Sequence, residues 1–201
     1  METFDEDRLR QSLTRLDPWK RVAFMALSCE RMVPNYDRFT ADSGFGDSQI
    51  LRRGIDAAWS WLESDRVPDD LKSVSARVEQ QAPNTEGFSS PFTSAALDAA
   101  NAVASLLDAI NEPDGADPVE VASLARDTVD LYVQEIENLN PNDRGLEDAI
   151  RRHPLMQAEL RRQRDDLTYL EHWTGLPRDA AQQLRARGVD TASGSLIATG
   201  G

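Results

Sequence analysis

Glu30 is the residue whose position most directly raises the question of chemistry. It lies in the segment CERMVPNY (29–36), at the end of an apolar stretch that predicts a helix over residues 18–33. On a helical wheel, Glu30 falls inside the apolar arc of that helix, which consists of Trp19, Val22, Ala23, Ala26, Cys29 and Val33. A carboxylate buried alone would lose several kcal/mol of hydration free energy. Glu30 must therefore be paired, hydrogen-bonded or protonated.

Two kinds of partner for Glu30 follow it in the sequence. One is an arginine of the next helix, from the segment LRRG (51–54). The other is the row of N–H groups at the start of that helix, because the glycines of SGFGDSQ (43–49) let another segment approach and a helix N-terminus attracts negative charge. Either arrangement makes Glu30 a structural clamp between two helices and their turn, and a functional carboxylate in a cleft is the alternative. The residues of this cluster are Glu30, Arg52, Arg53, Gly44, Gly46 and Asp47.

Two further carboxylates interrupt helical surfaces. Asp98 belongs to a narrow polar stripe on the otherwise apolar helix predicted over 93–110, and that stripe fits either a solvent-facing strip or the lining of a pocket. Glu135 lies on the apolar face predicted for residues 117–139, which consists of Val121, Leu124, Thr128, Leu131, Tyr132 and Leu139. If Glu30, Asp98 and Glu135 converged with an arginine from 52–53, they could bind a divalent cation or act as acid and base.

The common catalytic and metal-binding signatures are absent from the sequence. Neither His153 nor His172 follows a glutamate by three residues, as a helical di-iron site requires, and a single cysteine excludes zinc sites rich in Cys. GFGDSQ lacks the third glycine of a dinucleotide-binding loop, and there is no P-loop or nucleophile elbow. Cys29 lies on an apolar helix face and reads as a packing residue. The sequence thus predicts no catalytic residue, no metal and no cofactor.

The elements that must position these residues are all helical. Cap residues and prolines mark helix starts at Asp17–Pro18, at Asp47 or Ser48, and at Pro68, 117–118, Pro154 and Pro177, while Pro34 is expected to end the first long helix. No stretch alternates apolar and polar residues over five or more positions, which argues against strands. We predict a compact all-α bundle of about eight to ten helices forming one domain over 1–188. The last helix is expected to end at Gly188, before a flexible Gly/Ser-rich tail over 189–201.

A narrow apolar seam predicts how the helix over 154–173 packs. Its members repeat at four-three spacing, as in a coiled coil, and they are Met156, Leu160, Gln163, Leu167 and Leu170. Packing on the chain's own core is the plainer interpretation, and a homodimer contact is the alternative.

The composition limits the classes of partner. Lys and Arg number 22 and Asp and Glu number 35, which gives a net charge of −13. A surface with this much negative charge repels phosphate backbones and anionic lipids. We therefore expect no nucleic acid and no membrane among the partners. The arginine-rich segment 151–164 reads as a solvated helix face. One cysteine, no signal peptide and no apolar run of membrane-spanning length predict a cytoplasmic protein.

The segment 15–62 resembles a known family. It contains Trp19, CERM followed by PNY, GFGD at 44–47, and the RR pair followed by Asp56 and Trp59. This pattern is similar to the YjaG-like bacterial proteins grouped as domain of unknown function 416, and the likeness continues more loosely at 82–103 and 153–160. The resemblance implies an all-helical, bacterial, cytosolic, single-domain protein, and it implies no activity, substrate or catalytic residue.

Two functional hypotheses follow. The first is a non-enzymatic interaction or regulatory protein, acting as a homodimer or on another protein partner. The second is an enzyme or binder of a small ligand or metal that uses convergent carboxylates in a cleft between helices. They are distinguished by whether Glu30, Asp98, Glu135 and an arginine surround one open pocket or are separately paired.

Overall fold

The computed structural model describes residues 1–192, with the side chains of residues 1–188. In this part of the chain the secondary structure is all-helical, as predicted, with nine α-helices and two short 3-10 helices. In chain order the elements are α1 (Glu6–Thr14), α2 (Pro18–Ser43), α3 (Ser48–Ser64), α4 (Leu71–Glu79), η1 (Thr85–Gly87), α5 (Thr93–Asn111), η2 (Pro113–Gly115), α6 (Pro118–Ile136), α7 (Leu146–Arg152), α8 (Pro154–His172) and α9 (Pro177–Ala192).

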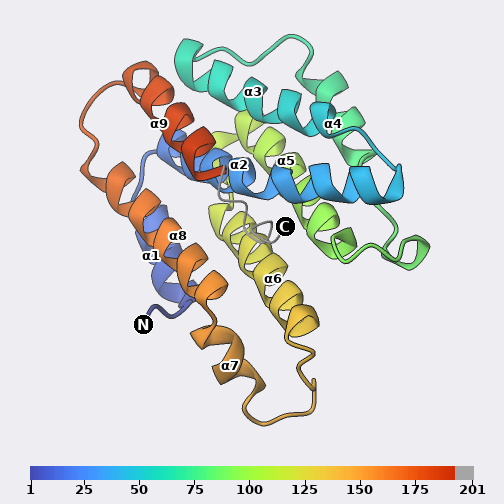
Figure 1. Ribbon diagram of the computed structural model, residues 1–201. Helices are drawn as coiled ribbons and strands as arrows, with labels where there is room; N and C mark the ends of the chain where they lie inside the picture. The colour runs from blue at the N-terminus through green and yellow to red at the C-terminus, as the bar shows by residue number, and fades with distance from the viewer. Residues whose placement is uncertain (193–201) are drawn as a thin grey trace.

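Helix α2 is the centre of the fold. It crosses the middle of the molecule, with α3 and α9 on one side and α6 and α8 on the other (Figure 1). It also packs along α5, whose alanines allow a close approach. Every residue from Val22 to Val33 is buried, Glu30 and Arg31 included. This part of α2 is therefore enclosed on all sides, and any charged side chain in it must find its partner inside the protein.

Pro34 does not end α2, contrary to the prediction. The helix continues to Ser43, and Asn35 is buried within it. A proline inside a helix costs about 3 kcal/mol. Continuing the helix places Tyr36 and Phe39 in the core, and burial of each large apolar side chain contributes about 1.5–3 kcal/mol. The two aromatic residues can therefore offset the proline.

The structure shows the N-terminal cap of α3 and the C-terminal end of α9, for both of which the sequence makes a prediction. Asp47 caps α3, since its Oδ1 accepts a hydrogen bond from the Gln49 N–H at 2.9 Å, as the sequence predicted for Asp47 or Ser48. Helix α9 runs to Ala192, so its predicted end at Gly188 was wrong. The rest of the predicted tail lies outside the described residues.

The buried face of α6 also differs from the predicted one. Leu131 is 48% exposed and Glu135 is exposed, although both were placed on the apolar face. The buried residues of α6 are Pro118, Val119, Val121, Ala122, Ala125, Thr128, Val129 and Val133. These buried residues are of small or medium size, which permits close contact of α6 with α5 and α8, and Leu131 lies outside this face.

The apolar seam of α8 packs within the chain. Met156, Leu160, Gln163 and Leu170 are buried and Leu167 is half-buried, while α8 contacts α6 and α2. The seam thus offers little surface to a second copy of the protein. A homodimer formed through another surface stays a prediction.

Candidate functional site

Glu30 is held by two side chains of α3. It is 1% exposed, its Oε2 accepts a hydrogen bond from Arg52 Nη1, and its Oε1 accepts one from Trp59 Nε1 at 3.0 Å. The Arg52 side chain is 32% exposed, so its charge still reaches water, whereas Trp59 is fully buried. Arg53 is exposed on α3. Both carboxylate oxygens of Glu30 are therefore engaged inside the protein.

The turn after α2, which contains Gly44 and Gly46, contacts Tyr36 and Gln81. Gly44 ends α2 in the left-handed conformation at φ +70°. Gly46 has φ +77°, and a Cβ added there would lie 2.1 Å from the Tyr36 hydroxyl. That hydroxyl donates to the Gln81 carbonyl at 2.8 Å, and burial raises the pKa of Tyr36 to about 12. The backbone N–H of Asp47 donates to Gln81 Oε1 at 2.9 Å. The start of α3 is thus used by its own cap and by Gln81, not by Glu30.

Helix α9 covers Glu30 from a third direction. A Cβ built on Gly188 would lie 3.0 Å from Glu30 Cγ and 3.4 Å from Leu27 Cδ2. The absence of a side chain at position 188 is what lets α9 approach α2 here. Glu30 is therefore enclosed by α2, α3 and α9.

Arg31, the next residue, forms the centre of a larger buried ion-pair cluster. It has no exposed surface, and its Nε and Nη2 donate to the two oxygens of Glu159 at 3.3 and 3.2 Å. Its Nη1 donates to Asp166 Oδ2 at 2.7 Å, and the other oxygen of Asp166 accepts from Arg187 Nε at 3.0 Å. Gln163 Nε2 donates to Glu159 at 2.9 Å. We call Arg31, Glu159, Gln163, Asp166 and Arg187 the α2–α8–α9 cluster.

The guanidinium of Arg31 is fully satisfied. A guanidinium has five N–H donors. Those not used by Glu159 and Asp166 are directed at the Leu27 carbonyl, 3.1 Å away, and at Ser28 Oγ, 3.4 Å away. Burial by itself lowers the pKa of Arg31, but the adjacent Glu159 and Asp166 carboxylates outweigh it and raise the pKa above its ordinary value. Arg31 is charged and has no N–H left for a ligand.

Cys29 lies in the same turn and is fully buried. Burial, reinforced by the neighbouring Glu30 carboxylate, raises the pKa of the Cys29 thiol above its ordinary range. A thiol with a raised pKa is a poor nucleophile near neutral pH. Its environment agrees with the packing role expected from the sequence.

Asp98 lies elsewhere, between α5 and α6. Its Oδ2 accepts a hydrogen bond from Thr128 Oγ1 at 2.8 Å. Burial raises the pKa of Asp98 from 3.8 to about 6, although the Thr128 bond opposes the shift and the nearby Asp127 adds to it. The carboxyl pKa of Asp98 is thus near the working range of an acid–base catalyst.

We expect Asp98→Asn to remove part of the pH dependence of stability. Because the folded-state pKa is raised, Asp98 favours folding fully below about pH 4, and that contribution is lost as the pH rises through about 6. Asparagine stays neutral and can still accept from Thr128. Asp98→Asn should therefore melt at a higher temperature than wild type at pH 8 and at nearly the same temperature at pH 4. Thermal melts at both pH values measure this, and an equal difference at both would contradict the assigned pKa.

The structure does not bring the predicted carboxylates together. Glu30 is paired with α3, Asp98 with Thr128 of α6, and Glu135 is exposed near the end of α6. Within the described residues, no group of three or more His, Cys, Asp or Glu side chains is arranged to hold a metal ion. The convergent site of the second hypothesis is therefore not formed by these three residues.

The α2–α8–α9 cluster is what the sequence analysis missed. A helical wheel with one buried face puts Arg31, about 100° round from Glu30, on the solvent-facing side of the helix. A signal was present on α8, since Glu159, Gln163 and Asp166 follow an i, i+4, i+7 spacing that puts three polar side chains on one face beside the apolar seam.

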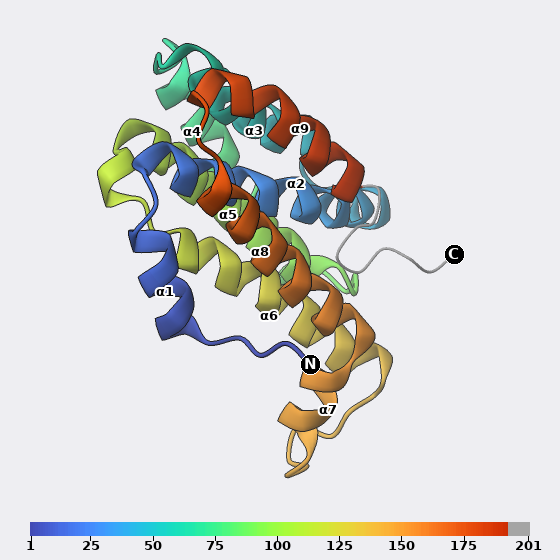
Figure 2. The same ribbon diagram turned by 90° about the vertical axis from the view of Figure 1, so that its left-hand side faces the viewer.

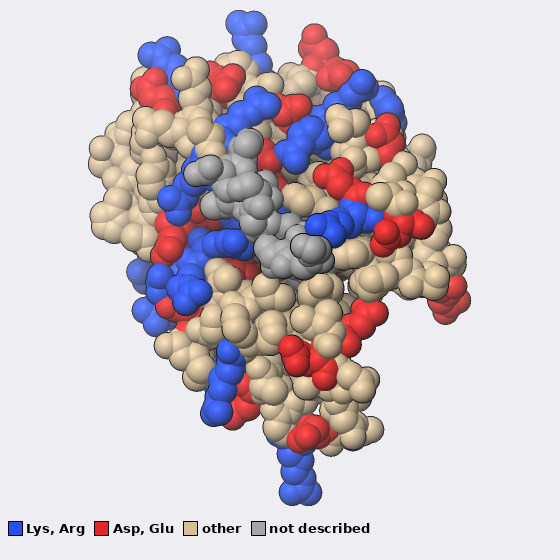
Figure 3. All heavy atoms as spheres, in the orientation of Figure 1, with Lys and Arg blue, Asp and Glu red and all other residues tan. Residues whose placement is uncertain are grey.

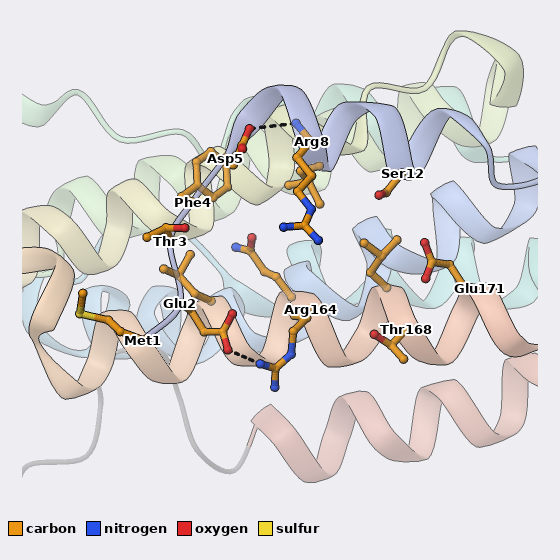
Figure 4. A pocket seen from close by; sticks show the side chains of 14 residues that line it. Met1, Glu2, Thr3, Phe4, Asp5, Arg8, Ser12, Arg164, Thr168 and Glu171 are labelled. Carbon is orange, nitrogen blue, oxygen red and sulfur yellow. Dashed lines mark hydrogen bonds and ion pairs between the residues drawn. The ribbon is translucent and has the colours of Figure 1, made fainter.

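A surface groove lies between the N-terminal segment, α1 and α8. Its volume is about 610 Å³. Arg8 points from α1 into it, opposite Arg164 and Thr168 of α8 (Figure 4). Among the described residues, no hydrogen bond or ion pair involves the guanidinium of Arg8. The lining consists of Met1, Glu2, Thr3, Phe4, Asp5, Arg8, Leu9, Ser12, Leu160, Gln163, Arg164, Leu167, Thr168 and Glu171.

The face of the molecule drawn in Figure 3 is not continuously acidic, although the chain has a net charge of −13. On the side drawn in Figure 3, arginine and lysine side chains are interspersed with acidic ones over much of the surface. The described helices also include none that is long and apolar enough to cross a membrane.

The family model described as "Protein of unknown function (DUF416)" matches residues 8–193. The chain belongs to this family. Its fold is that of a DUF416 family protein from Shewanella baltica whose crystal structure is known, with a TM-score of 0.82 and 25% identity over 94% of this chain and 95% of that one. The residues that the family model matches include the three helices of the α2–α8–α9 cluster. The resemblance stated from the sequence is thereby confirmed.

Curated relatives of the DUF416 chain are bacterial. "Uncharacterized protein YjaG" of Escherichia coli strain K12 is 38% identical over 95 residues, which are 47% of this chain and 48% of that protein. The Salmonella typhimurium protein of the same name is 36% identical over the same length, with the same coverage. The match thus spans about half the length of these curated relatives.

Proposed function

We propose that this DUF416 protein is a non-enzymatic binding protein that recognises a protein partner in the groove between the N-terminal segment, α1 and α8. One observation supports this most strongly. The ionisable groups at the centre of the fold are bonded to one another, whereas the guanidinium of Arg8, which has no partner among residues 1–188, points into an open cavity. A catalytic acid or base must reach its substrate, and Glu30 and Arg31 have no surface from which to do so.

The groove suits a peptide segment better than a small apolar ligand. Arg8 and Arg164 supply positive charge, and Asp5 and Glu171 supply negative charge. Leu9 and Leu167 contribute apolar surface between them. Mixed lining of this kind recognises both backbone and side chains, and Arg pairs readily with a carboxylate. The single cysteine, which cannot form an intramolecular disulfide, further supports a place in the cytoplasm.

Charge reversal at Arg8 tests the proposed function. Arg8 is exposed and its guanidinium has no partner among the described residues, so Arg8→Glu should fold normally while repelling an acidic group bound in the groove. Affinity capture from the native cell, followed by mass spectrometry, would be run with wild type, Arg8→Glu and the control Arg178→Glu. Arg178 is an exposed arginine of α9 that does not line the groove.

We expect a partner that wild type and Arg178→Glu retain in equal amounts and that Arg8→Glu loses. Identical sets of captured proteins for all three chains would refute the groove as the binding surface.

A further inference from the structure

The first five residues of the chain lie on α8 and α6 as a bound extended peptide would. Figure 2 shows this segment running without helix from α1 to α8. Met1, Thr3 and Asp5 are exposed, whereas Glu2 and Phe4 are half-buried. Side chains two residues apart in an extended chain point to the same side. Glu2 and Phe4 therefore form the side of the segment that faces the protein.

Gln157 of α8 recognises the backbone of this segment. Its Oε1 accepts from the Glu2 N–H at 2.7 Å, and its Nε2 donates to the Glu2 carbonyl at 2.8 Å. The same Nε2 donates to the Arg151 carbonyl at 2.8 Å, which fixes the orientation of the carboxamide. A carboxamide that bonds both the N–H and the C=O of one residue recognises extended backbone independently of side chain.

Two arginines recognise the side chains that face the protein. The Glu2 carboxylate pairs with Arg164 Nη1, as Figure 4 shows. The Phe4 ring lies under the guanidinium of Arg126, with 4.7 Å from the guanidinium carbon to the ring centroid. Such a cation–π contact favours an aromatic residue over an aliphatic one.

Both arginines are held in place by an acidic neighbour. Arg164 Nε donates to Asp165 at 3.1 Å, and Arg126 Nε donates to Asp127 at 2.9 Å. The receptor side is therefore oriented by bonds that do not depend on the N-terminal segment. Preorganisation of this kind increases affinity because less side-chain freedom is lost on binding.

We infer that this surface of α8 and α6 is a receptor for an extended peptide with a glutamate and, two residues later, an aromatic residue, and that residues 2–4 occupy it in cis. The inference rests on the proposed function, because it specifies the partner segment for one wall of the same groove. Few contacts hold the cis segment. Within residues 1–5 the backbone hydrogen bonds to other parts of the protein are those to Gln157 and the helical bond that Asp5 accepts from Leu9. A partner peptide can therefore displace it.

Binding of a labelled peptide tests the inference. The probe is METFDED carrying fluorescein, which matches residues 1–7, and the control probe is MKTADED, which lacks the glutamate and the aromatic residue. Each would be titrated by fluorescence anisotropy against full-length wild type and against the full-length variant E2K/F4A, whose own segment is released. The single variant Glu2→Ala serves as a milder release.

We expect METFDED to bind E2K/F4A at least tenfold more tightly than wild type, because the cis segment occupies the receptor in wild type. Glu2→Ala should lie between the two. Adding Arg164→Ala to E2K/F4A should weaken binding at least tenfold, because the probe's glutamate loses its partner, and MKTADED should bind none of the chains. Circular dichroism establishes that each variant is folded.

Equal affinity of METFDED for wild type and both released variants, or equal binding of the two probes, would overturn the inference. If peptide binding fails while capture still depends on Arg8, the motif alone is wrong. If capture does not depend on Arg8 while the peptide still binds as described, the proposed function is wrong.

Discussion

Arg31→Met is expected to lower the free energy of unfolding by about 3–5 kcal/mol, the range for removing one partner of a buried ion pair. The reason is that Glu159 and Asp166 would remain buried and charged without the guanidinium that satisfies them. A domain of ordinary stability has about 5–15 kcal/mol in total, so the variant should sit close to unfolding. Urea denaturation followed by circular dichroism measures the change.

Two further variants make this result specific. Arg178→Met removes an exposed arginine of α9 whose side chain is 69% exposed, and it should change stability by less than about 0.5 kcal/mol. Arg31→Met combined with Glu159→Gln removes one stranded charge and should recover at least about 1 kcal/mol of the loss. An Arg31→Met protein as stable as wild type would show that the buried ion pairs contribute nothing to the fold.

The second large effect is expected at Glu30. Glu30→Ala should destabilise the protein by about 2–3 kcal/mol, because the buried Trp59 Nε1 loses its acceptor and Arg52 loses its counter-charge. The effect should be smaller than at Arg31, since Arg52 is partly exposed and can be hydrated. Glu30→Gln keeps a carbonyl acceptor for Trp59 and should lose about half as much.

Glu63→Ala is the matched control, because Glu63 is an exposed glutamate of α3. It should melt like wild type. If Glu30→Ala also melts like wild type, Glu30 does not clamp α2 to α3.

The contacts of Glu30 could be anticipated because its partner follows closely in the chain. Arg52 is 22 residues away, on the next helix, so the wheel of α2 and the short connecting turn were enough to propose the pair. The partners of Arg31 could not be predicted from the sequence in this way. Glu159 and Asp166 are 128 and 135 residues away, and only the packing of α8 against α2 brings them near.

Two other predictions, the buried face of α6 and the end of α2, were wrong because tertiary packing overrides the local sequence pattern. The wheel assumes that a helix has one buried face, yet α2 is buried on every side between Val22 and Val33, and α6 leaves Leu131 exposed. Pro34 was expected to end α2 from local preference alone. The burial of Tyr36 and Phe39 overrides that preference, and only the tertiary structure shows it.

The account assigns stability to the buried ion pairs and partner binding to the groove. Its most direct test compares one variant of each. We would measure partner capture by folded Glu30→Gln and by folded Arg8→Glu side by side, at a temperature where both retain their helical circular dichroism. The account predicts that Glu30→Gln captures the partner like wild type and that Arg8→Glu does not. Capture that is lost in Glu30→Gln and kept in Arg8→Glu would place function in the core and contradict it.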